Sequence, residues 1–151
     1  MIGLAYGKRK IYYTTQEDSF KIPFVRKLIK YLRAIPIPEG IKNRKNFIKS
    51  INNVLKSGNI VHFYPEASLR PYCKEIRKFK NGAFDFAVKN EVPVIPMVYK
   101  FREPEGYRKI FKRKPDVTLK ILKPIKANIS GKNIKICVEG LKSEVKNVME
   151  E

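Results

Sequence analysis

Long apolar runs and paired cysteines are both missing from this sequence. The longest strictly apolar stretch, Val92–Tyr99, is short and contains two prolines, whereas a membrane-spanning helix needs about twenty apolar residues. No secretory signal pattern follows Met1. The two cysteines, Cys73 and Cys137, do not form a spaced pair, which excludes a disulfide framework and a cysteine-rich zinc site. We therefore expect neither a bound metal nor a cofactor.

Histidine is equally scarce, while apolar and basic residues are plentiful. His62 is the only histidine, so a self-contained Ser-His-Asp site would have to be built around it. The 151 residues are 43% hydrophobic and 11% aromatic, which suits one domain with a real core and excludes a disordered polycation. Lys and Arg number 33 against 14 Asp and Glu, giving a formal charge of +19.

The positive charge is spread along the chain rather than gathered in a tail. Residues 1–75 carry a net charge of +10 and residues 76–151 carry +9. Such a chain is attracted to polyanions, of which nucleic acid and an anionic membrane surface are the obvious examples. The alternative is a solvated, lysine-rich surface without a ligand. The densest basic cluster consists of Arg108, Lys109, Lys112, Arg113 and Lys114.

Hydrophobic periodicity predicts alternating strands and helices. Residues 43–57 are a good example, because their apolar residues follow the 3.6-residue period and Gly58 suits a left-handed cap. This alternation predicts an α/β fold with a mainly parallel central sheet flanked by helices. The predicted strands are Lys10–Thr15, Ala34–Glu39, Asn59–Tyr64, Val94–Tyr99 and Asp116–Leu122, and the predicted helices are Phe24–Leu32, Asn43–Ser57, Gly82–Lys89 and Ile134–Val148.

Candidate ligand-binding residues follow the predicted strand at residues 59–64. Parallel sheets bind ligands beyond the carboxyl ends of their strands, and a carboxylate, a hydroxyl and a guanidinium lie there within five residues. Basic side chains then lead to a predicted helix start, which is a favourable place for a phosphate. The alternative is an ordinary charged loop. The candidate substrate-binding residues are Glu66, Ser68, Arg70, Arg77, Lys80 and Gly82.

Four blocks carry a resemblance to a known family: Ala34–Pro38 (A-I-P-I-P), Tyr64–Glu66 (Y-P-E), Phe79–Phe84 (F-K-N-G-A-F) and Val92–Met97 (V-P-V-I-P-M). Their order and spacing resemble those of the lysophospholipid acyltransferases, which are similar to the acylglycerol-phosphate acyltransferases. That family has an F-P-E-G-T-R-S block, a K-x-G-A-F segment opening a helix and a V-P-I-V-P block on the next strand. The resemblance spans residues 10–100.

The resemblance implies a single acyltransferase-like domain over residues 1–151, forming the larger, C-terminal part of the family domain. The implied reaction moves a fatty acyl group from acyl carrier protein or coenzyme A to a lysophospholipid hydroxyl. The implied location is cytoplasmic, with peripheral association at an anionic membrane surface, and nucleic acid is the less favoured partner. The other function we consider is a non-catalytic basic domain that binds anionic lipid or nucleic acid.

The sequence departs from the family at the residues that carry the chemistry. The family's general base is the histidine of an H-x-x-x-x-D block, oriented by the aspartate, and this chain has no such block. His62 is followed five residues later by Ala67 and lies in a predicted strand, which favours a packed strand histidine. In the third block Gly-Thr is replaced by Ala67-Ser68, and Arg70 comes one position late. The arginine of the second block is replaced by Pro38-Glu39.

Residues 1–7 resemble the tail of the helix that follows the catalytic block in the family. We therefore expect that block to lie a few residues upstream of Met1, with this chain truncated at an internal methionine and inactive. A natural non-catalytic fragment is the alternative.

Overall fold

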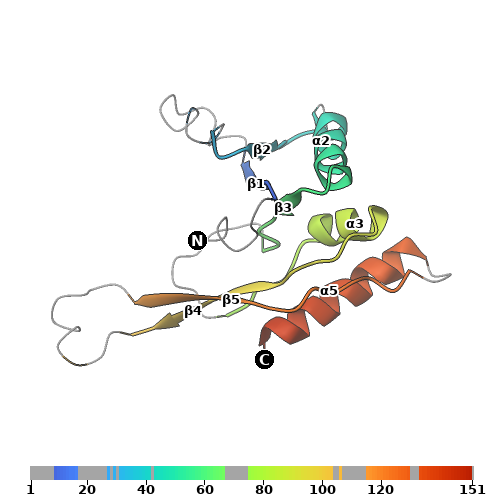
Figure 1. Ribbon diagram of the computed structural model, residues 1–151. Coiled ribbons are helices and arrows are strands. Elements are labelled where there is room, and N and C mark those ends of the chain that lie inside the picture. Colours follow the sequence, from blue (N-terminus) through green and yellow to red (C-terminus); the bar gives the residue numbers. More distant parts are fainter. Residues whose placement is uncertain are drawn as a thin grey trace. The chain divides into compact units, whose positions relative to one another are not determined.

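The computed structural model describes residues 9–16, 27, 29, 31–41, 43–66, 75–103, 106, 115–129 and 133–150. The chain divides into two compact units, Met1–Tyr64 and Pro65–Glu151 (Figure 1). The single domain expected from the chain length stays a prediction.

The first unit contains a three-stranded parallel sheet. Its strands are β1 (Ile11–Gln16), β2 (Ala34–Ile37) and β3 (Ile60–His62), in the order β2-β1-β3. Both pairings are parallel, which confirms the predicted α/β fold with a parallel sheet. Pro36 lies in β2 opposite Thr15, and β2 is an edge strand among the described strands, where a missing N–H is tolerated.

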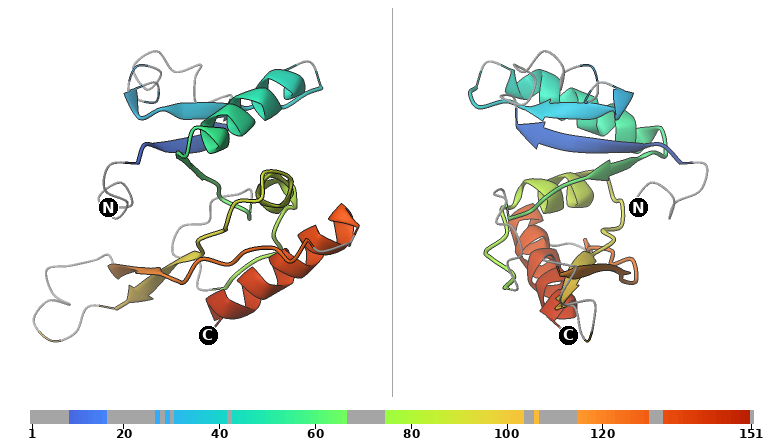
Figure 2. Two further views of the ribbon diagram at one scale, coloured as in Figure 1. Left: turned by 45° about the vertical axis from the view of Figure 1, so that its right-hand side comes forward. Right: turned by 90° about the vertical axis from the view of Figure 1, so that its left-hand side faces the viewer.

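Helix α2 (Arg44–Lys56) lies against the described sheet of the first unit and contacts β2 and β3 (Figure 2). The helix turns its fully buried Ile51 inward, while Ile48 on the same helix is 40% exposed. Ile11 and Thr14 of β1 are also buried. The helix ends as predicted, because Gly58 has a φ of +71° directly after the cap residue Ser57.

The second unit packs α3 (Gly82–Lys89) against α5 (Ile134–Glu150). Phe79 and Phe84 are stacked with ring centroids 5.9 Å apart, and both belong to the buried core. Cys137 and Leu141 of α5 lie in the same core. The bounds of α3 match the prediction, and α5 confirms the predicted C-terminal helix.

The last two strands, β4 (Met97–Arg102) and β5 (Asp116–Ile121), form an antiparallel ribbon that the sequence did not predict. The predicted strand at Val94–Tyr99 begins three residues later than expected, because Pro93 and Pro96 lack the N–H that a continuous ladder needs. Before β4, Val94 forms an isolated antiparallel bridge with Ile125. The ribbon therefore continues from a short paired base in the core of the second unit.

Several sequence predictions fall largely on residues that the structure does not describe. Of the predicted helix Phe24–Leu32, residues 27, 29 and 31 are described and are helical, and Leu32 lies in a turn. The five residues of the densest basic cluster lie outside the described residues. Among the described helices, none is long and apolar enough to cross a membrane.

Replacing Ile51 with alanine should destabilise the first unit far more than the same change at Ile48. A buried isoleucine cut to alanine costs about 2–5 kcal/mol through lost burial and the cavity left behind, whereas the exposed Ile48 loses little. Urea unfolding followed by far-ultraviolet circular dichroism measures both variants on the same helix. Equal losses in the two variants would contradict the buried position of Ile51.

Candidate functional site

Two interactions close the segment between β3 and α3. The backbone N–H of Lys80 donates a hydrogen bond to the carbonyl of Pro65 over 2.7 Å. Next to it, Arg77 Nε donates to Glu66 Oε2 over 3.2 Å, with both side chains partly buried. Glu66, Arg77 and Lys80, which the sequence singled out, are thus brought together, and the Glu66–Arg77 pair ties the two ends of the intervening segment.

The remaining sequence-predicted site residues divide into two groups. Ser68 and Arg70 lie outside the described residues, so their predicted roles stay predictions. Gly82 is the first residue of α3, and an added Cβ there would meet no atom within 4 Å. Steric crowding therefore does not require a glycine at position 82. Lys80 is exposed, and its ammonium forms no ion pair with any described residue.

A polar triad that the sequence did not reveal fixes the start of α3 to α5. Asn81 Nδ2 donates to Glu139 Oε1 over 2.7 Å, and Lys142 Nζ donates to Asn81 Oδ1 over 2.9 Å. Lys142 also pairs with Glu139. Hydrogen bonds from Lys142 and then Asn81 lower the pKa of Glu139. The Glu139 carboxylate therefore stands near the α3 N-terminus, and no signal in the sequence links two residues so far apart.

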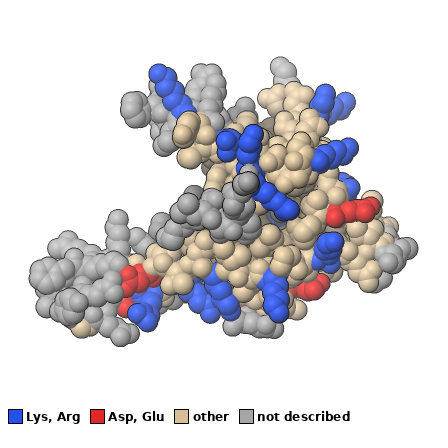
Figure 3. Space-filling model, viewed as in Figure 1, with Lys and Arg blue, Asp and Glu red and all other residues tan. Residues whose placement is uncertain are grey.

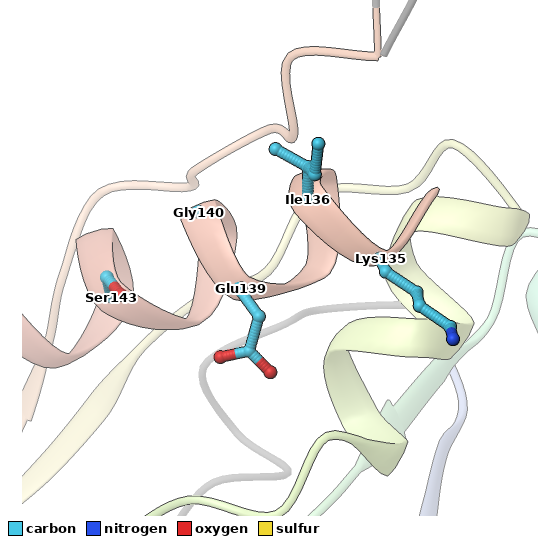
Figure 4. A pocket seen from close by; sticks show the side chains of 5 residues that line it. All are labelled: Lys135, Ile136, Glu139, Gly140 and Ser143. Atoms are coloured by element: carbon cyan, nitrogen blue, oxygen red, sulfur yellow. The ribbon is translucent and has the colours of Figure 1, made fainter. Parts of the chain in front are cut away.

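A shallow hollow of about 460 Å³ lies along α5. Figure 4 shows its lining, with Glu139 and Lys135 directed toward α3 and Ile136 directed away from it. Gly140 and Ser143 complete the lining. None of the sequence-predicted site residues borders this hollow, so it is not the site that the sequence indicates.

His62 packs in β3 of the first unit, as the sequence predicts. Its ring makes edge-to-face contacts with Tyr13, at a centroid distance of 5.6 Å, and with Tyr64, at 4.7 Å. Its Nε2 is buried without a hydrogen-bond partner, and burial lowers the pKa of the imidazole. The backbone carbonyl of His62 accepts a hydrogen bond from Thr14 Oγ1 over 3.0 Å. These contacts are those of a structural residue in the sheet.

Metal-binding groups do not cluster in the part of the chain that the structure describes. No three His, Cys, Asp or Glu side chains there are placed so that they could hold a metal ion. The Glu66–Arg77–Lys80 segment carries a carboxylate, a guanidinium and an ammonium, which are groups that can bind an anionic or hydroxylated molecule by hydrogen bonds and charge.

A family model described as Acyltransferase matches residues 1–100, which is about two thirds of the chain. The chain belongs to the acyltransferase family. This match includes all four resembling blocks and all six candidate site residues. The resemblance seen in the sequence is thus confirmed at the level of the family.

The acyltransferase chain is also similar to a solved structure, the 1-acyl-sn-glycerophosphate (LPA) acyltransferase PlsC from Thermotoga maritima. The likeness has a TM-score of 0.54 and 23% sequence identity, and it covers 94% of this chain and 58% of that chain. It shows a shared fold, and this chain spans less than two thirds of the length of PlsC. A search of curated proteins found no match.

The sole histidine should titrate below its usual pKa of 6.5 in the folded chain, because burial disfavours the charged imidazole. Its Hε1 signal can be followed by proton NMR against pH, with the same chain in concentrated urea as control. Between the folded and unfolded pKa values the unfolded chain binds more protons, so lowering the pH through 6.5 should reduce the free energy of unfolding. A folded midpoint at or above the urea value would contradict the buried position of His62.

Proposed function

We propose that this chain is a glycerolipid acyltransferase domain whose acceptor is a lysophospholipid hydroxyl. The donor would be a fatty acyl thioester on acyl carrier protein or coenzyme A. The observation that carries the proposal is the joint position of Glu66, Arg77 and Lys80 within the segment that the acyltransferase family model covers. The structure of PlsC, named for its lysophosphatidic acid acyltransferase activity, supports this choice of acceptor.

The residues of the segment have different roles in the proposed site. Glu66 and Arg77 engage each other, so we assign them to positioning the segment rather than to holding a phosphate. The exposed Lys80 ammonium is available to the acceptor's phosphate, and the adjacent N-terminus of α3 adds favourable backbone dipoles. Ser68 and Arg70 remain candidates for further contacts to the acceptor head group.

The proposed location is cytoplasmic, with peripheral association at an anionic membrane. A formal charge of +19 supports attraction to such a surface. The same charge also supports the second candidate, a non-catalytic domain that binds anionic lipid or nucleic acid. The absence of an H-x-x-x-x-D block from the 151 residues favours that candidate for the chain taken alone.

The 151-residue chain should show no acyl transfer on its own. General-base help is worth about 10²–10⁴-fold, and the only histidine of the chain is packed between aromatic rings without a following aspartate. The assay offers acyl carrier protein and coenzyme A thioesters with lysophosphatidic acid as acceptor. Measurable turnover would contradict the prediction, and turnover that persists in His62→Ala would show that the base is another residue.

Acceptor binding should depend on Lys80 even without turnover. We expect Lys80→Ala to weaken binding of a soluble short-chain lysophosphatidate roughly tenfold, because a charge-assisted hydrogen bond to the phosphate is lost. Lys89→Ala, which removes the same charge at the other end of α3, is the control and should have little effect. Calorimetric titration measures both, with the dephosphorylated monoacylglycerol as the second ligand. If Lys80→Ala and Lys89→Ala weakened lysophosphatidate binding equally, the loss would be explained by net charge alone, which would argue against a phosphate site at Lys80.

A further inference from the structure

The β4–β5 ribbon separates apolar from polar side chains. Its strands pair over six positions, from Met97 opposite Ile121 to Arg102 opposite Asp116. Because side chains alternate along a strand, the pairing places two sets on opposite sides. The apolar ribbon face consists of Met97, Tyr99, Phe101, Val117, Leu119 and Ile121, and the polar ribbon face consists of Val98, Lys100, Arg102, Asp116, Thr118 and Lys120.

The apolar ribbon face is not part of the core of the second unit. None of its six residues belongs to the buried cluster or to the partly buried residues packed against it. Tyr99, Val117 and Ile121 are 42%, 42% and 41% exposed. Figures 1 and 2 show that the ribbon extends beyond α3 and α5. A two-stranded ribbon is marginally stable by itself, so a partner that covers this face would stabilise it.

The charge on the ribbon indicates the chemistry of that partner. Lys100, Arg102 and Lys120 are all exposed on the polar ribbon face, where Asp116 is the one acidic residue. Exposed lysines 123 and 126 continue the basic character after β5. In Figure 3, Lys and Arg side chains follow the lower edge of the second unit, below β4, β5 and α5, with few acidic side chains between them. The partner should therefore be apolar next to one face and anionic around it.

We propose that the β4–β5 ribbon is the surface by which this chain docks on an anionic phospholipid bilayer. The apolar ribbon face lies against the boundary between head groups and acyl chains, as the apolar side of an interfacial helix does. The lysine and arginine stems of the polar ribbon face extend along the thin ribbon and place their charges among the lipid phosphates. The inference deepens the proposed function, since it rests on an acceptor that resides in a membrane.

The arrangement of aromatic and basic residues disfavours nucleic acid as the occupant. Base stacking with phosphate contacts requires aromatic and basic side chains on the same surface. Tyr99 and Phe101 belong to the apolar ribbon face, whereas Lys100 and Arg102 belong to the polar ribbon face. A second copy of the chain is disfavoured because two chains of +19 repel each other. Both alternatives are outcomes of the test below.

Two adjacent residues of β5 provide a matched pair of variants. Val117→Asp and Thr118→Asp add the same charge at neighbouring exposed positions, but on opposite faces of the ribbon. Binding to phosphatidylglycerol vesicles is measured by sedimentation with the full chain, with phosphatidylcholine vesicles and high salt as electrostatic controls. Thr118→Asp should weaken binding about fivefold through charge alone, and Val117→Asp should weaken it about tenfold further, because a carboxylate replaces an apolar side chain at the lipid. Circular dichroism verifies that both variants fold.

Tryptophan variants test the orientation directly, because the chain contains no tryptophan. With phosphatidylglycerol vesicles, Val117→Trp should shift its emission to shorter wavelength and be quenched by brominated acyl chains. Thr118→Trp should do neither to a comparable extent. An emission shift of Val117→Trp without vesicles that grows with protein concentration would overturn the proposal in favour of a second copy.

The outcomes separate this inference from the proposed function. Equal vesicle binding by the two aspartate variants, while the parent chain still binds, would overturn docking by the ribbon and leave peripheral membrane association intact. Failure of the parent chain to bind phosphatidylglycerol vesicles would overturn both docking by the ribbon and peripheral membrane association. Binding of a single-stranded oligonucleotide that Tyr99→Ala and Lys100→Ala weaken equally would assign the ribbon to nucleic acid instead.

Discussion

The second unit depends on the burial of Phe79 and Phe84 against α5. These rings are 3% and 2% exposed and are stacked on each other, and burying two phenylalanines is a large apolar contribution for a small core. They bracket a four-residue stretch in which Lys80 and Asn81 face solvent. Because both ends of the stretch are held by the core, the Lys80 backbone is fixed where it can bond to Pro65. The position of the candidate site is thus a consequence of apolar packing.

Polar contacts then refine what the core has placed. The Glu66–Arg77 pair and the Asn81–Glu139–Lys142 triad each join segments that are separate in sequence. Such exposed or half-exposed pairs contribute little stability, but they restrict orientation. The second unit therefore presents the exposed Lys80 next to the start of α3, where the Asn81 side chain is already hydrogen-bonded to Glu139 and Lys142 of α5. Within the segment Lys80–Phe84, Phe84 is buried in the core, whereas Lys80, the residue that we propose for recognition, is exposed.

The sequence predicted local structure well and contacts between distant residues poorly. The spacing of apolar residues predicts α2 and α5 because each helix buries one face, and the Pro36–Pro38 segment is predicted to be extended because proline excludes the helical alternative. The direction of β5 relative to β4 was not predictable, since two apolar strands can pair either way until their connection is known. The charges of Glu66 and Arg77 make each a candidate from the sequence, but their mutual pairing depends on the path of the chain between them.

The total charge did not distinguish lipid from nucleic acid, whereas the folded arrangement of charged residues does bear on the choice. Lysines spread evenly along a chain can form many surfaces. In the ribbon, the alternation of side chains along β4 and β5 places the apolar residues on one face and the basic residues on the other.

That alternation also limits how this sequence can change in evolution. One residue inserted or deleted within β4 or β5 would shift the following side chains to the opposite face and place lysine among the apolar residues. Changes of length in the connection between the two strands would leave the alternation of both strands intact. Among relatives of this chain, length variation should therefore be frequent between residues 103 and 115 and rare within the two strands.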